Sequence, residues 1–481
     1  MEQAALNFVA DEGEAAPFPE KTGFTGDPFV DMGALVMDTL PFETAEEKIR
    51  FATDVYVDRW GGKLHSVFLH SKITNIPAKG KPERQRNDSL TYYLGILKNE
   101  GTGANGYCRI CAQKGPLFPG ERTNFPLAGS GGFINFHHFH EQGVFLCGVC
   151  LIKLFFLPLG IVECGDKLMI LQPDDDDSKK LWQTDCVQEN LDKISRGSSK
   201  GMLKAKLQNP RNALFHIAGR LIDKFDLAEK PAKAIRLVYF TNFGPKAQMD
   251  FYDLPNYIFS FLKRVCQPDL KTSWMAFVKR HYWFRKSVSF DEEKGEWVEK
   301  KKKEMIQLNA EEYSGSNRNA IYERLLSGKT ITGYLCRMHK KASFPIMITI
   351  TYLKEVRNMR QEQIDLIRSI ADKIIRLAQE DGENFKKFIT PIEGTKYASQ
   401  LRLEILRCVK THYIKGETEP FVRLNDYVDY LFPDGQYWSE VRDLLLICLY
   451  EKLHELRIEP SHVSDGDIAA PEADGVDGFN R

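Results

Sequence analysis

The 481-residue sequence lacks a net charge, a long apolar run and a basic N-terminus. Lysine plus arginine and aspartate plus glutamate each total 66, so any contact with a polyanion has to come from a local patch. The longest apolar stretch, near residues 149–162, is interrupted by Lys153 and Pro158, which argues against a membrane-spanning helix. The segment before Lys21 is acidic, unlike a signal peptide. We therefore expect a cytoplasmic protein with no membrane partner.

Motifs of nucleotide-dependent and acyl-transfer chemistry are also missing. The sequence has no Walker loop, no Gly-x-Gly-x-x-Gly after an expected strand, and no Gly-x-Ser-x-Gly elbow. These absences remove the commonest signatures of phosphoryl transfer, dinucleotide binding and serine hydrolysis. We therefore expect a protein that is not an enzyme.

The length predicts two or three domains, and a hydrophobic fraction of 43 % is ample for packed cores. Turn signals mixed with short apolar runs favour an α+β region at the start of the chain. Strands are expected at residues 167–171, 235–240 and 249–254, and a helix at 255–266. A four-lysine run, residues 300–303, is flanked by glutamates and predicts a solvated helix.

Near residue 345 the pattern changes to helical periodicity. Apolar residues recur at steps of three and four from Val356 to Leu377, from Tyr397 to His412 and from Trp438 to Leu453. We therefore predict a multidomain α+β fold, with a zinc-stapled N-terminal region at residues 1–345 and a C-terminal helical bundle at 346–456. Acidic residues, glycine and proline dominate 457–481, which predicts a disordered acidic tail.

Two Cys-x-x-Cys pairs, Cys108 with Cys111 and Cys147 with Cys150, carry the strongest chemical signal. Each pair can place two thiolates on one side of a tight turn, and two such turns complete the tetrahedral sulfur set that Zn²⁺ accepts. Four ligands leave no open position, so the zinc is expected to be structural and to staple a finger lobe at about residues 105–155. The alternatives are reduced, unligated thiols or a redox pair. The other six cysteines are scattered singly, as buried core residues are.

Asn135, His137, His138 and His140 lie between the two cysteine pairs and raise a second interpretation. Histidines and an asparagine between zinc knuckles are typical of HNH nucleases, in which a second metal cuts a phosphodiester. That pattern requires another histidine or asparagine shortly after the second knuckle, whereas the next histidine here is His216. We favour the alternative that this stretch packs beside the zinc.

Basic residues are concentrated in three segments despite the neutral total. Residues 193–211 contain six basic residues and no acidic one, residues 271–286 interleave cations with aromatic rings, and residues 72–87 form a proline-flanked basic segment expected to be a loop. An ordinary solvated surface is the alternative in each case. The candidate nucleic-acid contacts are Lys72, Asn75, Lys79, Lys81, Arg84, Arg86, Asn87, Lys193, Arg196, Lys200, Lys204, Lys206, Arg211, Lys279 and Arg280.

Four stretches together resemble one family, the large subunit of the type I-B CRISPR surveillance complex (Cascade), in the subtype whose large subunit carries a zinc finger. Their order and spacing span the chain up to about residue 456. The stretches are Phe24-Thr25-Gly26-Asp27-Pro28-Phe29-Val30-Asp31, the two cysteine pairs, Val238-Tyr239-Phe240-Thr241-Asn242-Phe243-Gly244 with Tyr252-Asp253-Leu254-Pro255, and Leu431-Phe432-Pro433-Asp434-Gly435 leading into Trp438.

The resemblance implies a role in antiviral defence. Such a subunit reads the protospacer-adjacent motif on duplex DNA, supports strand opening and recruits a nuclease-helicase, while guide pairing reads the sequence. Its implied partners are the backbone, crRNA-capping and small subunits, crRNA, target double-stranded DNA, and the effector nuclease-helicase or transposition proteins. The motif-reading residues are not carried over from the family; on chemistry alone we expect them within residues 72–87 and 193–211.

The family also suggests that the C-terminal bundle resembles the separate small subunit, which in type I-B systems can begin at an internal translation start. Met347 and Met359 stand where such a start would be needed. A stand-alone zinc-dependent DNA-binding regulator is a third class. It would need a helix-turn-helix with basic recognition positions, which we do not find in the sequence.

Overall fold

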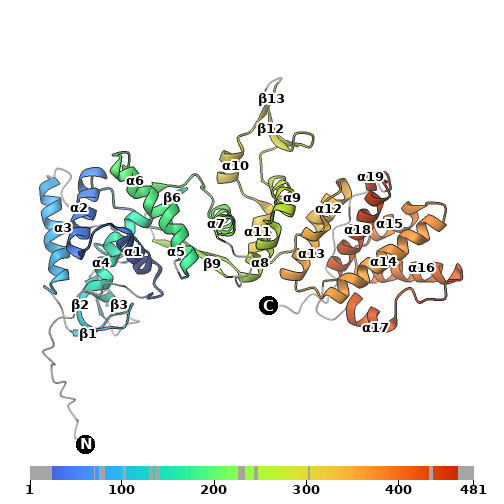
Figure 1. The fold of residues 1–481 in the computed structure, drawn as a ribbon, viewed down its shortest axis with the longest axis horizontal. Coiled ribbons are helices and arrows are strands. Elements are labelled where there is room, and N and C mark those ends of the chain that lie inside the picture. The colour runs from blue at the N-terminus through green and yellow to red at the C-terminus, as the bar shows by residue number, and fades with distance from the viewer. Residues whose placement is uncertain are drawn as a thin grey trace, which may run out of the picture. The chain divides into compact units, whose positions relative to one another are not determined.

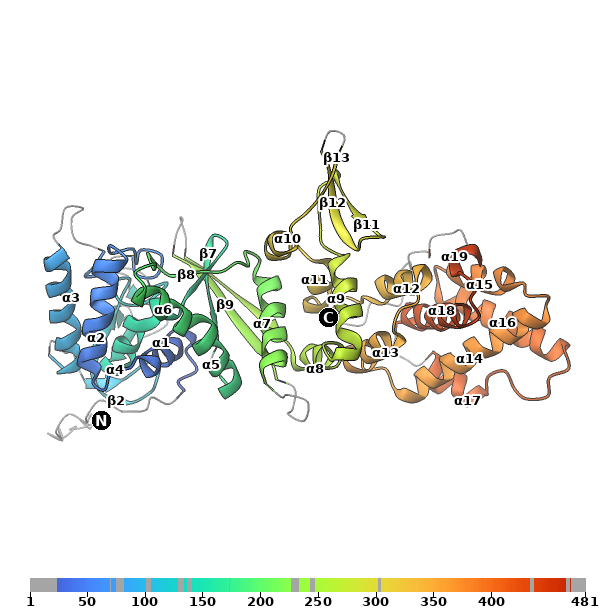
Figure 2. The same cartoon turned by 45° about the horizontal axis from the view of Figure 1, so that its top comes forward.

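The computed structural model describes residues 24–69, 71–74, 82–100, 105–128, 134–135, 141–142, 144–172, 174–225, 233–242, 247–301, 304–432, 437–463 and 468. The chain divides into two compact units (Figures 1 and 2). Unit 1 contains Met1–Phe225 and Ile235–Asp253, and unit 2 contains Asp226–Ala234 and Leu254–Arg481. The fold is α+β: the N-terminal part carries sheets and the C-terminal part is helical, as predicted.

The largest sheet of unit 1 has five strands, and helices α1 and α7 pack on it. The order of this five-stranded sheet is β10 (Gln248–Leu254), β9 (Ile235–Thr241), β7 (Lys167–Leu171), β6 (Val162–Cys164) and β8 (Leu203–Lys204). Strand β6 pairs antiparallel with β7 and parallel with the short edge strand β8. The strands predicted at 167–171, 235–240 and 249–254 are confirmed. The helices of unit 1 are α1 (Pro28–Thr39), α2 (Ala45–Asp54) with the π-helical turn Val55–Arg59, α3 (Pro82–Leu97), α4 (Gly148–Phe156) with the 3₁₀ turn Leu157–Gly160, α5 (Asp176–Trp182) with the π-helical turn Gln183–Gln188, α6 (Glu189–Ser195) and α7 (Pro210–Lys224).

Two smaller sheets lie in the cysteine-bearing part of unit 1. Strands β1 (Asn105–Tyr107), β2 (Lys114–Gly120) and β5 (Val144–Cys147) form an antiparallel sheet in that order. Strands β3 (Ile134–Asn135) and β4 (Glu141–Gln142) form a two-stranded ladder. Helix α4 follows β5 directly and packs on β2, β5 and α3, so it connects this lobe to the rest of unit 1.

The start of α1 is fixed by a capping network, and its middle by a close helix crossing. Asp27 is the N-cap residue, and the Asp31 carboxylate accepts hydrogen bonds from Thr25 and Gly26. Helix α1 packs on α4 at Gly33, where an added Cβ would lie 1.9 Å from the Lys153 carbonyl oxygen. Only glycine allows the two backbones to approach this closely.

Unit 2 begins with helices that pack on the predicted bundle. Helix α8 (Asn256–Val265) confirms the helix predicted at 255–266 and packs on α13 (Ile346–Glu355), with the rings of Phe261 and Tyr352 5.8 Å apart. The boundary between compact units therefore falls after Asp253, well before the change in sequence pattern near residue 345. The periodicity changes there because helices become longer, whereas the packing continues across that point.

The C-terminal helices match the predicted stripes. Helix α14 (Gln361–Glu380), helix α16 (Ala398–Ile414) and helix α18 (Trp438–Glu455) cover the three periodic segments, and α18 is buried over most of its length. The remaining helices of unit 2 are α9 (Pro268–Lys279), α10 (Ala310–Ser316), α11 (Ala320–Leu326), α12 (Thr332–Lys341), α15 (Phe385–Glu393), α17 (Leu424–Asp426) with the π-helical turn Tyr427–Leu431, and α19 (Pro460–Val463).

The four-lysine run does not form the predicted helix. Lys300 and Lys301 end strand β12 (Glu296–Lys301), which pairs with β11 (Val288–Asp291) and β13 (Glu304–Gln307) in an antiparallel sheet. The structure describes neither residue 302 nor 303. Alternation of buried and exposed side chains favours a strand here, since Val298 is buried between more exposed neighbours. The flanking glutamates are equally compatible with a helix, and this is why the prediction was wrong.

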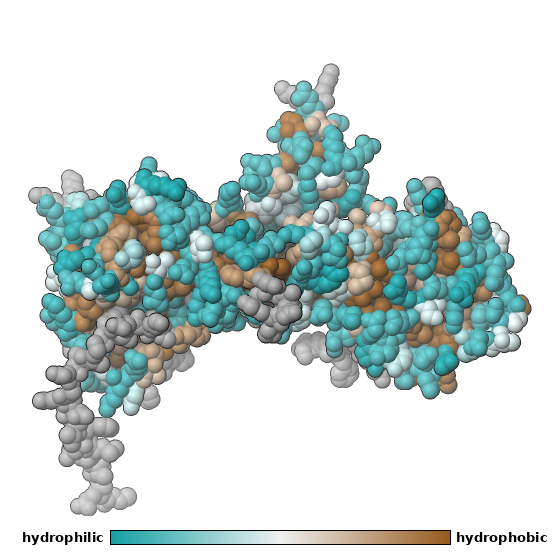
Figure 3. Space-filling model, viewed as in Figure 1, coloured by the Kyte–Doolittle hydropathy of each residue, from teal (hydrophilic) through white to brown (hydrophobic). Residues whose placement is uncertain are grey.

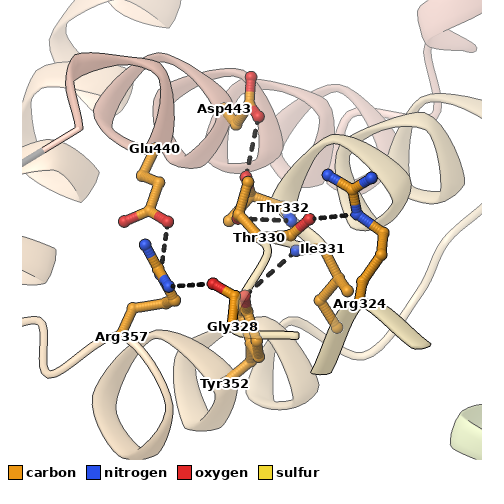
Figure 4. A network of polar contacts seen from close by, with 9 residues as sticks. All are labelled: Arg324, Gly328, Thr330, Ile331, Thr332, Tyr352, Arg357, Glu440 and Asp443. Atoms are coloured by element: carbon orange, nitrogen blue, oxygen red, sulfur yellow. Dashed lines mark hydrogen bonds and ion pairs between the residues drawn. The ribbon is translucent and has the colours of Figure 1, made fainter. Parts of the chain in front are cut away.

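A buried polar network joins α18 to the segment before α12. Figure 4 shows Arg357 between Glu440 of α18 and the Gly328 carbonyl, with Nε to Oε1 2.6 Å and Nη1 to O 3.2 Å. One turn further along α18, Asp443 accepts a hydrogen bond from Thr332 at 3.0 Å. Burial raises the pKa of both carboxyl groups, so their partners are needed to keep them in the interior.

The acidic tail predicted from residue 457 is ordered at its start. Helix α19 packs on α12, α15 and α18, and Val463 and Ile468 are buried. The prediction of disorder is therefore wrong for these residues, because a few apolar side chains suffice to dock a short helix. Residues 464–467 and 469–481 lie outside the described part of the chain.

Hydrophilic residues predominate on the face of each unit drawn in Figure 3, and hydrophobic residues form separate patches there. Across the described ranges, every helix is too short or too polar to cross a membrane.

Candidate metal centre and basic surfaces

Two backbone turns bring the four cysteines together. The first knuckle, Cys108 to Cys111, joins β1 to β2 and is closed by the Ala112 N–H donating to the Cys108 carbonyl at 2.9 Å. Arg109 N–H donates to the Phe145 carbonyl of β5 at 3.1 Å, which ties this knuckle to the strand that carries Cys147. The second knuckle runs from the end of β5 into α4, so Cys147 occupies the N-cap position of the helix and Cys150 lies in its first turn. Both sit where the helix dipole favours a thiolate.

The sulfur positions fit one metal ion. The Cys108 and Cys150 sulfurs are 3.8 Å apart, and those of Cys111 and Cys147 are 3.6 Å apart. All four sulfurs lie within 4.8 Å of one another. Sulfurs bound tetrahedrally at about 2.3 Å from zinc are about 3.8 Å from one another, whereas disulfide sulfurs are about 2.0 Å apart. The four cysteines can therefore hold a metal ion, and these distances show that no disulfide joins them.

The thiols of the cluster affect one another's protonation. Hydrogen bonding from the Cys147 and Cys150 thiols lowers the pKa of Cys108, and the hydrogen bond to Cys108 raises the pKa of Cys147 to about 12. The same partner raises the pKa of Cys150. Four thiolates at this spacing repel one another unless a cation neutralises them, so metal binding here releases protons.

Helix α3 supports the second knuckle through a close contact. A Cβ added at Gly148, between the ligands Cys147 and Cys150, would lie 3.0 Å from Ile96 Cγ2 and 3.2 Å from the Ile96 carbonyl oxygen. Glycine at this position lets α4 begin against α3. Of the two inner sulfur ligands, Cys108 is 3 % exposed and Cys150 1 % exposed. The centre is thus closed by protein on one side, as a structural metal site is.

The remaining cysteines behave largely as predicted. Cys164, Cys186, Cys336, Cys408 and Cys448 are buried, and burial raises the pKa of each thiol. Cys266 is partly exposed, unlike the others. All ten cysteines are free of disulfides.

The histidines between the knuckles, His137, His138 and His140, lie outside the described residues, as does the side chain of Asn135. Only the backbone pairing of Asn135 in β3 is described.

The basic segment 72–87 is described at its two ends, a turn at residues 72–74 and a helix from Pro82. Lys72 lies over the Tyr92 ring at 5.2 Å, while Asn75, Lys79 and Lys81 lie outside the described residues. The second half is helix α3 rather than the expected loop. Pro82 at its start and Glu83 in its first turn are helix-start signals that sequence reasoning missed.

The cations of α3 differ in their availability. Arg86 donates to Asp54 at 2.9 Å and to Asp58 at 2.6 Å, so it holds α3 to the end of α2. Arg84 is exposed, with Asp88 3.6 Å away, and Asn87 is exposed. Arg86 is therefore committed to the fold.

Part of the segment 193–211, Lys193 and residues 198–204, lines a basic cavity. Lys193 closes α6 and pairs with Glu189 at 2.7 Å, Arg196 and Lys200 are exposed in the following loop, and Lys204 lies on edge strand β8. Lys206 is also exposed in the loop that leads to α7. Beyond it, Arg211 lies over the Tyr252 ring at 5.5 Å.

The cavity, of about 790 Å³, also receives side chains from a distant segment. Lys63, His65 and Ser66 also line it. Sequence reasoning missed these residues because they are 130 positions away from Lys193 along the chain. The Gly61-Gly62 turn that precedes Lys63 is the only local signal, and both glycines have positive φ.

Residues 271–286 serve mainly as structural residues. Lys279 pairs with Glu296 and Arg280 with Glu292, so both predicted contacts anchor the β11–β13 sheet to α9. Trp274 is fully buried, whereas Trp283 is 60 % exposed beneath the Arg318 guanidinium. Of the other rings in this segment, His281, Tyr282 and Phe284 are partly exposed and pack against further rings of unit 2.

The chain was compared with protein-family models, with curated proteins and with solved structures, and none of the three comparisons found a match.

Proposed function

We propose that this chain is a zinc-stapled large subunit of a type I-B RNA-guided surveillance complex. In this role it reads a short motif on duplex DNA, supports strand opening and recruits an effector nuclease-helicase or transposition proteins. The observation that carries the proposal is the closed four-cysteine centre in the same compact unit as the basic cavity beside residues 193–204. A closed metal centre suits a protein that holds shape, because it offers no position for a substrate.

Zinc is the metal that this ligand set favours. A tetrahedral set of four thiolates suits zinc or iron, and a mononuclear site built from two Cys-x-x-Cys knuckles is typical of structural zinc. Cys108, Cys111, Cys147 and Cys150 would hold the ion. When bound, it joins the β1–β2 knuckle to the start of α4, and its binding energy becomes folding energy of the lobe.

The motifs on which the family resemblance rests have structural roles in this chain. This supports the proposal that the chain is a structural subunit. Thr25, Asp27 and Asp31 cap α1, as described above. Asn242 is 6 % exposed; its amide nitrogen donates to the Val67 carbonyl at 2.5 Å, and its oxygen accepts from the Leu127 N–H at 3.1 Å. These residues fix the architecture of unit 1 rather than a reaction centre.

The division of labour in such complexes fits the neutral total charge. Guide pairing reads the sequence, so the protein needs only local cationic surfaces that follow a phosphate backbone. The exposed loop cations Arg196 and Lys200 provide such a surface, whereas Arg86, Lys279 and Arg280 are already paired with carboxylates.

The test is co-expression of the full chain with candidate backbone, crRNA-capping and small subunits and a guide RNA. We expect a stable ribonucleoprotein with about one zinc per chain. It should bind duplex DNA that carries a matched target and its adjacent motif more tightly than DNA without them. A chain that stays alone after co-expression contradicts the proposal.

The HNH-like nuclease is the alternative that this experiment has to exclude. The double variant His137→Ala with His138→Ala separates the two functions. A structural subunit keeps target binding in this variant, whereas a nuclease loses Mg²⁺-dependent cutting by the isolated chain. Cutting of DNA by the isolated wild-type chain, abolished in the variant, would favour the nuclease.

A further inference from the structure

The cavity beside residues 193–204 has the composition of an anion site. Its lining includes four lysines, Lys63, Lys193, Lys200 and Lys204, and a single carboxylate, that of Glu163. The hydroxyl group of Ser66 and the imidazole of His65 add further groups that can donate hydrogen bonds. A cluster of cations around one cavity repels itself unless an anion lies between its members.

Two of the four lysines are available to a ligand. Lys63 and Lys200 are exposed and make no ion pair within the described part of the chain. Lys193 is held by Glu189 at 2.7 Å, and Lys204 has Glu163 at 3.9 Å. The two uncommitted lysines come from separate segments, Lys63 from the turn after Trp60 and Lys200 from the loop after α6, and both line the cavity, so one ligand can contact both.

The wall formed by residues 198–201 is held in place from inside the protein. The Trp60 indole N–H donates to the Ser199 hydroxyl at 2.9 Å, and that hydroxyl lies 3.2 Å from the Gly201 carbonyl and 3.4 Å from Asn190 Oδ1. Trp60, Asn190 and Ser199 are all buried. Gly197, with φ of 69°, allows the turn out of α6. The loop is therefore shaped before any ligand arrives, which lowers the entropic cost of binding.

The floor of the cavity is part of the main sheet. Lys204 lies on edge strand β8, whose parallel pairing with β6 places it beside Glu163. The Ala205 N–H continues this pairing by donating to the Glu163 carbonyl at 2.8 Å. The register of the sheet therefore determines the position of Lys204 at the cavity.

We propose that this cavity binds the sugar–phosphate backbone of a nucleic acid, with Lys63 and Lys200 contacting phosphate oxygens. The inference rests on the proposed function and adds to it the place where the backbone is held. A volume of about 790 Å³ exceeds the need of one phosphate and accommodates a nucleotide-sized segment. The lysine and serine donors recognise phosphate oxygens but carry no base-specific pattern, so the site positions the chain and does not read sequence.

The test compares two double variants of the full-length chain. Lys63→Ala with Lys200→Ala removes the two uncommitted cations, whereas Lys98→Ala with Lys180→Ala removes two exposed lysines of unit 1 that lie outside the cavity lining. Both variants change the net charge equally. The probes are a duplex DNA without terminal phosphates, a single-stranded RNA, and inorganic phosphate as a competitor. Zinc content and circular dichroism check that both variants are folded.

We expect the cavity variant to bind the duplex or the RNA roughly ten-fold more weakly at low salt and the control variant to bind as wild type does. The slope of log affinity against log salt should become shallower by about two, one unit for each phosphate that the variant no longer neutralises. Which of the two polymers is affected identifies the source of the phosphate.

Equal weakening in both double variants would overturn the proposal, because bulk charge would then explain the effect. Inorganic phosphate that binds the wild-type chain but not the cavity variant, without any loss of nucleic-acid affinity, would also overturn it. Failure of the proposed function would be recognised differently. Assembly with partner subunits and zinc content are measured on the wild-type chain and do not depend on the cavity lysines. If the cavity variant assembles normally and its nucleic-acid affinity is unchanged, the proposed role of the cavity is refuted and the proposed function of the chain is not.

Discussion

The indole nitrogen of Trp60 donates a hydrogen bond to the hydroxyl of Ser199, which lies 139 positions later in the sequence. Both residues are buried, and the bond joins the end of the π-helical turn Val55–Arg59 to the loop after α6. Since Ser199 also contacts Asn190 and Gly201, one hydroxyl group holds the conformation of the whole loop.

Replacing Ser199 with alanine should destabilise unit 1 by about 1–3 kcal/mol, because the buried indole N–H loses its acceptor. Amide hydrogen exchange should also speed up in residues 198–204. The control is Ser198→Ala, since the Ser198 hydroxyl is exposed and donates only to the Lys193 carbonyl. Equal exchange in the two variants would show that the Trp60 hydrogen bond does not hold the loop.

Removing one metal ligand should release the metal and unfold the finger lobe. We expect Cys111→Ser to lower the bound zinc from about one per chain to near zero, as a strong chelator does with the wild type. Metal analysis of the purified protein measures this, and limited proteolysis locates the loosened segment. The control Cys266→Ala lies outside the cluster and should retain its metal. Zinc retained by Cys111→Ser would contradict a four-cysteine site.

Two glycines in helices of unit 1 should respond oppositely to alanine. Gly33→Ala should cost at least about 3 kcal/mol, because its Cβ would meet the Lys153 carbonyl oxygen and force α1 and α4 apart. Gly219→Ala, inside α7, meets nothing within 4 Å and should stabilise by about 0.4–1 kcal/mol. Thermal unfolding of both variants gives the two signs. A neutral Gly33→Ala would mean that the two helices are less closely packed than described.

The stability of unit 2 should fall as the pH drops below neutral because of His339. Burial lowers the pKa of His339 from 6.5 to about 3, helped by nearby His454. Between these values the unfolded chain binds the proton and the folded chain does not. Stability is therefore fully present above pH 6.5 and is lost toward pH 3, by up to about 1.4 kcal/mol per pH unit.

Hydrogen exchange of α12 and α13, corrected for intrinsic rates, measures this loss. The variant His339→Gln should show a flatter pH dependence, since glutamine does not titrate. Thr349→Val removes the hydroxyl 3.1 Å from the His339 ring but leaves the imidazole, so it should keep the wild-type slope. Identical slopes in wild type and His339→Gln would assign the acid sensitivity to other groups.

The sequence predicted the parts of the molecule in which neighbouring residues determine the structure. The spacing of Cys108, Cys111, Cys147 and Cys150 was enough to predict the cluster, because each knuckle is a local turn. Helices α14, α16 and α18 were predicted for a similar reason, since each buries a continuous apolar stripe.

Features that depend on distant parts of the chain could not be predicted in this way. Lys63 and Lys200 are far apart in the sequence and line one cavity only in the folded chain, and Arg86 is neutralised by aspartates about 30 positions earlier. Helix α3 has only a weak apolar stripe of its own, because its burial depends on packing against α2 and α4. Composition alone therefore overstated the basic surface at Arg86, Lys279 and Arg280.

The position of Asn242 sets the order in which unit 1 can be completed during synthesis. This side chain joins Val67 to Leu127, yet it leaves the ribosome after both, and after residues 226–234, which belong to unit 2. The cysteine cluster, complete at Cys150, can take its metal long before strand β9 is available. The metal-loaded lobe would then be folded while the five-stranded sheet is still incomplete. Until translation has passed Asn242, the nascent chain would expose the edge of β7 that later pairs with β9.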